Sequence, residues 1–305
     1  MTFAILDFGT NTFNLLIAKR GKGSFSILHS GKEPVKLGRG GIQSNRLSPD
    51  AFERGFVAIQ NHLEIIRQFE VDEIRAFATS AIRNASNGQQ FVDEVFNRFG
   101  IRTRIVPGKR EAELIYKGVR RAVKLDERKA LILDIGGGSC EFILCSREGI
   151  IWKQSFEIGM ARVLELFRVS DPISPEDVTA LETWFGQQLG PLFEVVEKER
   201  PRLLIGASGT FDTIAELRAH RKKLIPDGNY GRAIPLKDFA EIHEALLKST
   251  AESRRAMPGM EPVRVEMIVL ASVFVSYVLR VCRIGELHHS AFALKEGVIS
   301  ELTGF

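Results

Sequence analysis

Cysteine is scarce in this sequence of 305 residues, and its spacing is unsuited to cross-links or metal sites. Three occur, Cys140, Cys145 and Cys282, which is an odd number without any C-x-x-C pair. Paired spacings of that kind are typical of disulfide frameworks and zinc sites. The sequence therefore argues against both and predicts a protein of the reducing cytoplasm.

A long hydrophobic run is also missing. The longest strongly apolar stretch without charge lies between Glu266 and Arg280, over residues 267–279, whereas a membrane span needs about 20 residues. We therefore expect a buried helix there and no membrane partner. The first residues, MTFAILDFGTNTF, have no basic flank and carry Asp7 inside the apolar part, which is not typical of a signal peptide.

Low-complexity segments and flexible linkers are absent from the sequence as well. Hydrophobic residues make up 44% of the chain, which is far more than in disordered proteins. The length suffices for two domains of about 150 residues, each with its own core.

Charge is unevenly distributed along the chain, although the net charge is only +4. Residues 1–124 hold 20 Lys and Arg against 12 Asp and Glu, whereas residues 125–305 hold 22 against 26. A basic lobe favours an anionic partner such as nucleic acid, phosphate or acidic lipid, and an ordinary solvated surface is the alternative.

Strand-like and helix-like segments alternate, which indicates an α/β protein. Ser48-Pro49 and Ser174-Pro175 have the residue types that begin helices. The expected strands cover residues 3–8, 13–20, 25–29, 74–78, 102–106, 132–135, 141–145 and 203–205. The expected helices cover residues 49–69, 87–99, 110–123, 174–198 and 210–219, and the chain is expected to be largely helical after residue 235.

One pattern occurs twice. Ala4–Thr10 and Ile132–Ser139 are both apolar strands that end in Asp-x-Gly and are followed by small polar residues and a second apolar strand. This weak duplication predicts two similar lobes that face each other across a cleft. We place the lobes at residues 1–124 and 125–305, with the alternative that the last helix, about 292–305, packs back on the first lobe.

Three loops have residues suited to phosphate. In Asp7–Thr12, backbone amides and hydroxyls are suited to bind phosphate oxygens, and Asp7 is suited to bind a hydrated Mg²⁺. The alternative is an ordinary hairpin turn. Asp134–Ser139 contains three consecutive glycines, which suit the close approach of a ligand to the backbone. It matches neither a Walker A loop nor a dinucleotide fingerprint. Gly206–Thr210 precedes a helix, and the start of a helix is suited to bind an anion or a ribose. The alternative is a corner at which strand and helix pack closely.

Together these loops resemble those of the actin/sugar kinase/heat-shock chaperone ATPase fold, with two ribonuclease H-like lobes. Within that superfamily the chain resembles the exopolyphosphatase/guanosine pentaphosphate phosphohydrolase (Ppx/GppA) family, in a short two-domain form without the C-terminal HD-type domain of longer members. The matching segments are Asp7–Phe13, Ala78–Arg83, Pro107–Val119, Asp134–Glu141, Gly206–Thr210 and Pro258–Arg264.

The resemblance implies hydrolysis of terminal phosphoanhydride bonds in inorganic polyphosphate, guanosine pentaphosphate or both, with release of phosphate. It implies Mg²⁺ or another divalent cation as cofactor, and it makes a homodimer plausible, with no DNA partner. The implied catalytic residues are Glu111, as base, and Arg83. The implied metal ligands are Asp7, Asp134 and Glu141, and the implied phosphate-binding residues are Thr10, Asn11, Thr12, Gly136, Gly137, Gly138, Ser139, Gly209 and Thr210.

One departure from the family pattern leaves the base open. Where the family commonly has Glu-Glu-Ala-Arg, this chain has Arg110-Glu111-Ala112-Glu113, so that Glu113 is a rival of Glu111. Arg83 could instead be a surface arginine, and Glu141 could be an outward residue of its strand. Two other functions are an ATP-dependent small-molecule kinase of the same superfamily and a nonenzymatic nucleotide- or polyphosphate-binding regulator.

Overall fold

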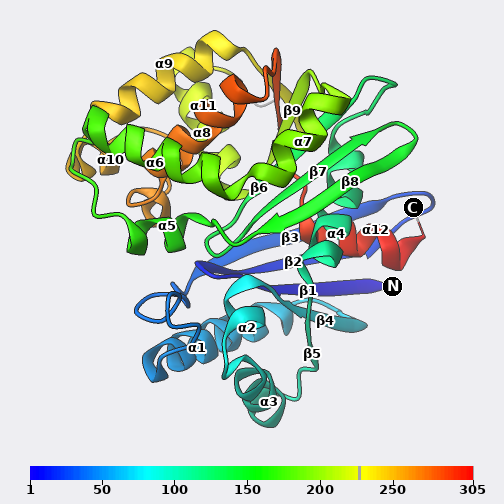
Figure 1. The fold of residues 1–305 in the computed structure, drawn as a ribbon. Helices are drawn as coiled ribbons and strands as arrows, with labels where there is room; N and C mark the ends of the chain where they lie inside the picture. Colours follow the sequence, from blue (N-terminus) through cyan, green and yellow to red (C-terminus); the bar gives the residue numbers. More distant parts are fainter. Residues whose placement is uncertain (226–227, 305) are drawn as a thin grey trace. The chain divides into compact units, whose positions relative to one another are not determined.

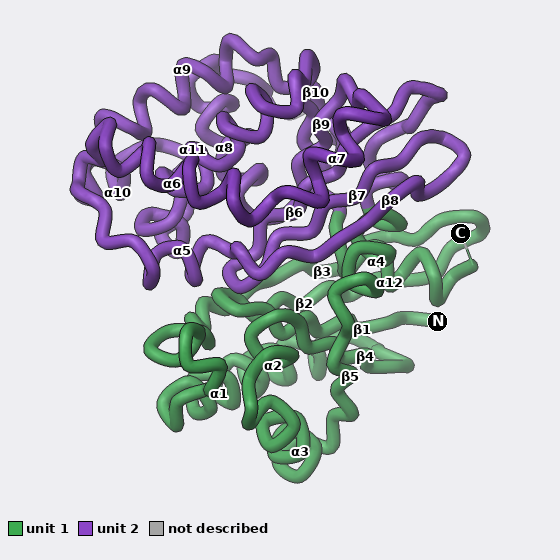
Figure 2. The backbone as a smooth tube through the Cα atoms, viewed as in Figure 1, with its two compact units in different colours: residues 1–118, 293–305 green, residues 119–292 purple. Residues whose placement is uncertain are grey.

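The computed structural model describes residues 1–225 and 228–304, and the chain divides into two compact units. Unit 1 comprises residues 1–118 and 293–305, and unit 2 comprises residues 119–292 (Figure 2). The last segment of the chain therefore belongs to the same unit as the first. The domain boundary at residues 124–125 and the cleft between the lobes stay predictions.

The sheet of unit 1 has the strand order β3-β2-β1-β4-β5 (Figure 1). The first three strands are antiparallel neighbours, whereas β1, β4 and β5 run parallel. The central strand β1 is buried almost throughout, which is why it reads as a continuous apolar run. The bounds are β1 (Thr2–Phe8), β2 (Thr12–Arg20), β3 (Phe25–Pro34), β4 (Glu73–Ala78) and β5 (Thr103–Ile105).

Helices α1 and α3 pack together in the apolar core of unit 1, which strands β1, β2 and β4 also line. The Ser48 hydroxyl accepts a hydrogen bond from the Ala51 amide at 3.2 Å, and Pro49 occupies the first turn of α1, as the sequence predicts. Phe56 of α1 stacks on Phe91 of α3 with the ring centroids 5.4 Å apart. The bounds are α1 (Pro49–Ile66), α2 (Ser80–Asn84), α3 (Gly88–Phe99), α4 (Gly108–Ala122) and α12 (Leu294–Thr303).

The sheet of unit 2 repeats this arrangement. Its order is β10-β11-β9-β6-β7-β8, in which β6, β7 and β8 are antiparallel neighbours and β6, β9 and β11 run parallel. The antiparallel strand β10 is added at one edge. The duplicated α/β architecture predicted from the sequence is confirmed. The bounds are β6 (Ala130–Ile135), β7 (Cys140–Ser146), β8 (Gly149–Phe156), β9 (Leu203–Ala207), β10 (Gly231–Ile234) and β11 (Glu286–Ser290).

Helices surround the core of unit 2, and the apolar stretch before Arg280 forms the buried helix that the sequence predicts. Ten residues of that helix, α11, are buried. The bounds are α5 (Met160–Leu166), α6 (Pro175–Gln188), α7 (Gly190–Glu199), α8 (Ser208–Lys222), α9 (Leu236–Leu247), α10 (Ala251–Arg255), the 3₁₀ turn η1 (Pro262–Arg264) and α11 (Ile268–Val281).

Some predicted elements are wrong in their extent. The single helix predicted over residues 174–198 is two helices, because Pro191 lacks the amide hydrogen that a continuous helix needs and starts α7 instead. Strand β3 continues to Pro34 rather than ending at His29, since its polar second half pairs with β2. Strands β8, β10 and β11 are missing from the prediction, because apolar and polar residues do not alternate regularly in them. Strand β11 interrupts the largely helical segment expected after residue 235.

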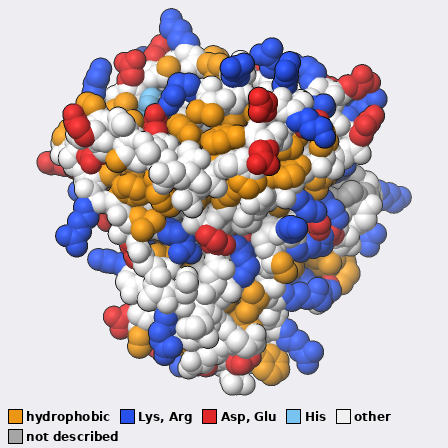
Figure 3. Space-filling view, in the orientation of Figure 1, with side chains coloured by type: hydrophobic (Ala, Val, Ile, Leu, Met, Phe, Trp, Pro, Cys, Tyr) orange, Lys and Arg blue, Asp and Glu red, His pale blue; other side chains and the backbone are white. Residues whose placement is uncertain are grey.

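Among residues 1–225 and 228–304, no helix combines the length and the apolar character needed to cross a membrane. On the face drawn in Figure 3, basic and acidic side chains are scattered among each other.

Candidate active site

The two Asp-x-Gly segments form the same tight turn. The Gly9 amide donates to the Thr12 carbonyl at 3.1 Å, and the Gly136 amide donates to the Ser139 carbonyl at 3.0 Å. A Cβ on either glycine would lie 2.8 Å from that carbonyl oxygen. Both turns therefore need glycine at this position, and the sequence repeat corresponds to one repeated structure.

The aspartate at the end of each first strand lies opposite a polar residue of the second. Asp7 pairs with Asn14, and Asp134 pairs with Glu141. Side chains of directly opposed residues lie on the same face of a sheet. Each turn thus has two polar side chains beside it, and one of the four is Asn14, which the sequence reasoning did not single out.

One carboxylate oxygen of Asp7 lacks a hydrogen-bond partner among the described residues. Its Oδ2 accepts from Asn14 Nδ2 at 3.0 Å, whereas Oδ1 is buried without a hydrogen-bond partner among the described residues. Burial raises the pKa of Asp7, and the charge of Lys295 and the Asn14 hydrogen bond oppose this. A cation beside Oδ1 would compensate for the lost hydration, so the carboxylate fits the predicted role of a metal ligand.

The loop Thr10–Thr12 is buried, and the segment that follows β3 binds its backbone. The carbonyls of Thr10 and Asn11 accept from the amides of Leu37 at 2.7 Å and Val35 at 2.8 Å. Arg54 of α1 in turn donates to the carbonyls of Val35 at 2.8 Å and Lys36 at 3.0 Å. The sequence reasoning missed Arg54, because its contacts are to backbone atoms of a distant loop.

Glu111 lies in the first turn of α4 and is paired with Arg83 of α2. Arg83 Nη1 lies 2.5 Å from Glu111 Oε2 and also donates to the Val106 carbonyl at 3.0 Å. The two side chains are 14% and 9% exposed, so the surface alternative for Arg83 is wrong. The pair fixes the direction of the Glu111 carboxylate at the start of the helix.

The rival carboxylate has different surroundings. Glu113 Oε2 accepts from Arg110 Nη1 at 2.9 Å, and its side chain is 34% exposed. Arg110 also pairs with Glu301 of α12, as does Lys117. Glu113 thus belongs to a group of charges that joins α4 to α12, whereas Glu111 points to a different, more buried environment.

In unit 2, the glycine loop is bound to the start of α5. The carbonyls of Gly136 and Gly137 accept from the amides of Met160 at 3.0 Å and Ala161 at 2.8 Å. Gly159 lies so close to the loop that a Cβ there would overlap the backbone of Gly137 and its neighbour. Gly159 is a further residue that the sequence reasoning missed.

The carboxylates of unit 2 are both hydrogen-bonded. Asp134 Oδ2 accepts from Ser208 Oγ at 2.9 Å, which joins the second loop to the third. Glu141 is 1% exposed, and its Oε1 accepts from the hydroxyls of Ser139 and Ser155, both at 2.7 Å. Glu141 is therefore not an outward residue of its strand, and that alternative is wrong.

The third loop begins α8 and is packed against an arginine. A Cβ on Gly209 would overlap the guanidinium of Arg264, and Thr210 is 2% exposed. Arg264 Nε is buried without a hydrogen-bond partner in the described part of the chain and lies 3.8 Å from Glu261 Oε2. Gly209 thus lies directly against the end of the Arg264 side chain.

Each unit therefore assembles part of the predicted site. Unit 1 contains the first loop and the Arg83–Glu111 pair, and unit 2 contains Asp134, Glu141 and the other two loops. Within residues 1–225 and 228–304, no three His, Cys, Asp or Glu side chains are grouped as a complete metal site. A magnesium ion that is held by one or two carboxylates, water and phosphate oxygens does not need such a group.

Comparison with known proteins gives one family and several relatives of similar length. The model of the Ppx/GppA phosphatase family matches residues 16–304. "Exopolyphosphatase 2" of Mycobacterium tuberculosis is 27% identical over 99% of this chain and 98% of its own length. A "Putative exopolyphosphatase" of Haemophilus influenzae is 28% identical over 98% of this chain and 90% of its own. The crystal structure of an exopolyphosphatase from Cytophaga hutchinsonii is 36% identical, with a TM-score of 0.96 over 100% of this chain and 98% of that one.

Proposed function

Because the chain belongs to the Ppx/GppA phosphatase family, as its motifs indicated, we propose that it removes terminal phosphate from inorganic polyphosphate. Membership makes the chain a hydrolase of phosphoanhydride bonds. Two relatives that match nearly the whole chain are described as exopolyphosphatases, which supports polyphosphate as the substrate. We propose guanosine pentaphosphate as a second substrate, since its terminal bond is a phosphoanhydride too.

The observation that carries the proposal is the buried Arg83–Glu111 pair. We assign Glu111 as the general base that takes a proton from the attacking water, because its carboxylate is held in one direction and is largely shielded from solvent. Glu113 is more exposed and engaged by Arg110, which suits a structural role. Arg83 is a positioning residue for Glu111 in this proposal.

We propose Asp7 in unit 1 and Asp134 in unit 2 as Mg²⁺ ligands, with Glu141 directly opposite Asp134 in the strand register. The unsatisfied Asp7 Oδ1 supports this assignment. A bound Mg²⁺ neutralises charge on phosphate oxygens as the anhydride bond breaks. Hydrolysis is therefore expected to stop when a chelator removes divalent cations and to return when Mg²⁺ is added.

We assign phosphate binding to the loops. In unit 1, Thr10, Asn11 and Thr12 present a buried turn that the segment after β3 holds in place. In unit 2, the carbonyls of the glycine loop are engaged by α5. The Gly136 amide is itself engaged by the Ser139 carbonyl, so the proposal rests on the other backbone amides of the loop, the groups that bind phosphate in such turns. The assigned residues of unit 2 are Gly136, Gly137, Gly138, Ser139, Gly209 and Thr210.

The test is release of phosphate by the purified protein with Mg²⁺ and either medium-chain polyphosphate or guanosine pentaphosphate. Wild type is expected to hydrolyse polyphosphate, and Glu111→Gln to be slower by about 10²–10⁴-fold, the usual contribution of a general base. Glu113→Gln is the matched control and is expected to retain most of the rate.

Two outcomes would contradict parts of the proposal. If wild type releases phosphate from neither substrate, the assigned activity is wrong. If Glu113→Gln loses the rate while Glu111→Gln keeps it, the base is Glu113. Phosphate transfer that needs an added acceptor would instead support the kinase alternative.

A further inference from the structure

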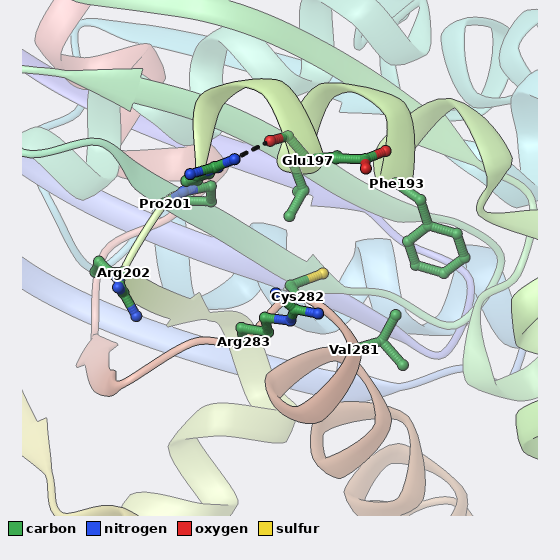
Figure 4. A pocket seen from close by; sticks show the side chains of 9 residues that line it. Phe193, Glu197, Pro201, Arg202, Val281, Cys282 and Arg283 are labelled. Atoms are coloured by element: carbon green, nitrogen blue, oxygen red, sulfur yellow. Dashed lines mark hydrogen bonds between the residues drawn. The ribbon is translucent and has the colours of Figure 1, made fainter.

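A pocket lies in unit 2, away from the three loops. It has a volume of about 460 Å³ and lies where α7 ends, where β9 begins and where α11 ends (Figure 4). Two backbone hydrogen bonds hold these parts together, because the amides of Gly285 and Glu286 both donate to the Arg202 carbonyl at 3.0 Å. The volume is within the range of small-molecule sites.

Three arginines line this pocket, and their guanidinium groups make few hydrogen bonds to the described part of the protein. They are Arg200, Arg202 and Arg283, and the one acidic residue in the lining is Glu197. In the described chain, the guanidinium groups make a single hydrogen bond, from Arg200 Nε to the Glu197 carbonyl, and at 3.4 Å it is long. Arginine is the residue that best matches phosphate and carboxylate groups geometrically.

Two of these arginines occupy a backbone conformation that normally favours glycine. Arg200 ends α7 with φ 50°, and Arg283 follows α11 with φ 52°. Helices commonly end in a glycine at such a left-handed position. An arginine near a helix end can also bind the last carbonyls, but only the long Arg200 bond does so here. The chain thus keeps two arginines at strained backbone positions, and both line one pocket.

The remaining wall is apolar. Phe193, Val196 and Val281 line it together with Cys282, and Figure 4 shows the sulfur of Cys282 among the lining groups. Burial raises the pKa of the Cys282 thiol to about 12, so that it is a neutral, unreactive part of the wall. An inorganic anion would leave this apolar surface unused, whereas an organic anion would cover it.

The pocket is distinct from the loops because it lies at the opposite ends of the same strands. Arg202 directly precedes β9 (Leu203–Ala207), and Ser208 of the third loop directly follows it. Five strand residues span about 16 Å at about 3.3 Å each. A ligand in the pocket would therefore be separated from the loops by the length of β9.

From the three arginines and the apolar wall we infer a second ligand site for a phosphorylated compound with an aromatic ring, which is the chemistry of a nucleotide. The phosphates lie against Arg200, Arg202 and Arg283, and the ring lies against Phe193 and Val281. The inference is independent of the proposed hydrolysis, since none of these residues belongs to the loops or to the Arg83–Glu111 pair.

The test is calorimetric titration of the full chain with adenosine 5′-(β,γ-imido)triphosphate in the absence of divalent cations. In the variant Arg200→Gly with Arg283→Gly, binding at the pocket is expected to be at least tenfold weaker. Glycine suits both backbone positions, so the midpoint of thermal unfolding is expected to stay or to rise. Loss of binding therefore cannot be attributed to unfolding.

The matched control removes two exposed arginines outside the pocket, Arg168→Ala with Arg221→Ala, and is expected to bind as wild type does. Irradiation with 8-azidoadenosine triphosphate is expected to label peptides around residues 193–202 or 281–286. The inference is overturned if the pocket variant titrates as wild type does, if the control weakens equally, or if neither peptide is labelled. Equal binding of inorganic tripolyphosphate at the pocket would overturn the assignment of an aromatic ligand.

Discussion

At the scale of single residues, Gly159 shows how closely the glycine loop is supported. A Cβ at this position would overlap backbone atoms of Gly137 and Gly138, which cannot move aside as a flexible side chain can. We predict that Gly159→Ala lowers the free energy of unfolding by about 1–3 kcal/mol, as overpacking does, and reduces phosphate release. Denaturant unfolding and the phosphate assay would measure the two effects.

The control for this substitution is Gly190→Ala, because no atom lies within 4 Å of a Cβ there. That variant is expected to unfold at wild-type denaturant concentration or above. Equal loss of stability in both variants would mean that the close approach to the loop is not the cause.

The ion pair of Arg83 and Glu111 allows a second residue-scale prediction. Arg83→Leu removes the guanidinium that is paired with the buried Glu111 carboxylate. We expect this loss to lower the free energy of unfolding by up to about 3 kcal/mol. The double variant Arg83→Leu with Glu111→Leu removes both charges and is expected to regain part of this stability. If the two effects on unfolding free energy simply add, the residues are not coupled.

Sequence reasoning identified the residues that form a local pattern. The Asp-x-Gly turns and Glu111 could be predicted because neighbouring residues in the chain mark them. Gly159 and Arg54 could not, because what constrains them is a backbone segment far along the chain. The roles of the predicted residues in catalysis and metal binding stay predictions.

At the scale of elements, two glycines decide how α4 and α12 cross. A Cβ on Gly118 would overlap the Ala293 carbonyl, and a Cβ on Gly297 would overlap the Leu114 carbonyl. The helices therefore approach each other at backbone distance. Arg110 and Lys117 of α4 add ion pairs to Glu301 of α12. The helix that carries Glu111 is positioned in this way by the last helix of the chain.

We predict that Gly297→Ala moves α12 away from α4 and lowers the midpoint of thermal unfolding by several degrees, because the added methyl group meets backbone atoms. Phosphate release is expected to fall as well, since α4 carries Glu111. Glu301→Gln is a milder comparison that removes the ion pairs but leaves the helix crossing intact. A smaller effect for Gly297→Ala than for Glu301→Gln would contradict the dominance of the crossing.

The sequence predicted most elements but not these crossings. Caps such as Ser48 mark the start of a helix locally, whereas the break between α6 and α7 at Pro191 was read as one helix because the apolar pattern continues through it. Residue types therefore indicated where α1 and α6 begin more reliably than where α6 ends.

At the scale of the whole molecule, one buried and two partly buried histidines predict how stability depends on pH. Burial lowers the pKa of His62, His243 and His288, so they stay neutral in the folded state below the ordinary value of about 6.5. The unfolded chain then binds more protons, and the free energy of unfolding decreases as pH falls below about 6.5. For His62, which is 1% exposed, the slope is at most about 1.4 kcal/mol per pH unit.

Denaturant unfolding at pH 7.5 and 5.5 would measure this dependence. His62→Gln is expected to reduce the difference between the two pH values, because glutamine can donate to the Phe13 carbonyl as His62 does but does not titrate. His220 is exposed, and His220→Gln is expected to leave the difference unchanged. An unaltered pH dependence in His62→Gln would contradict the role of that histidine.

The composition of unit 1 has a consequence for synthesis on the ribosome. Residues 1–118 are made first, but α12 follows only after unit 2 has been translated. At about 5–20 residues per second, this delay lasts roughly 10–35 s. During that interval the surface of α4 that α12 will cover stays exposed, and the N-terminal unit lacks its last helix. Unit 2, the middle of the chain, therefore has all of its residues before unit 1 does, although synthesis begins with unit 1.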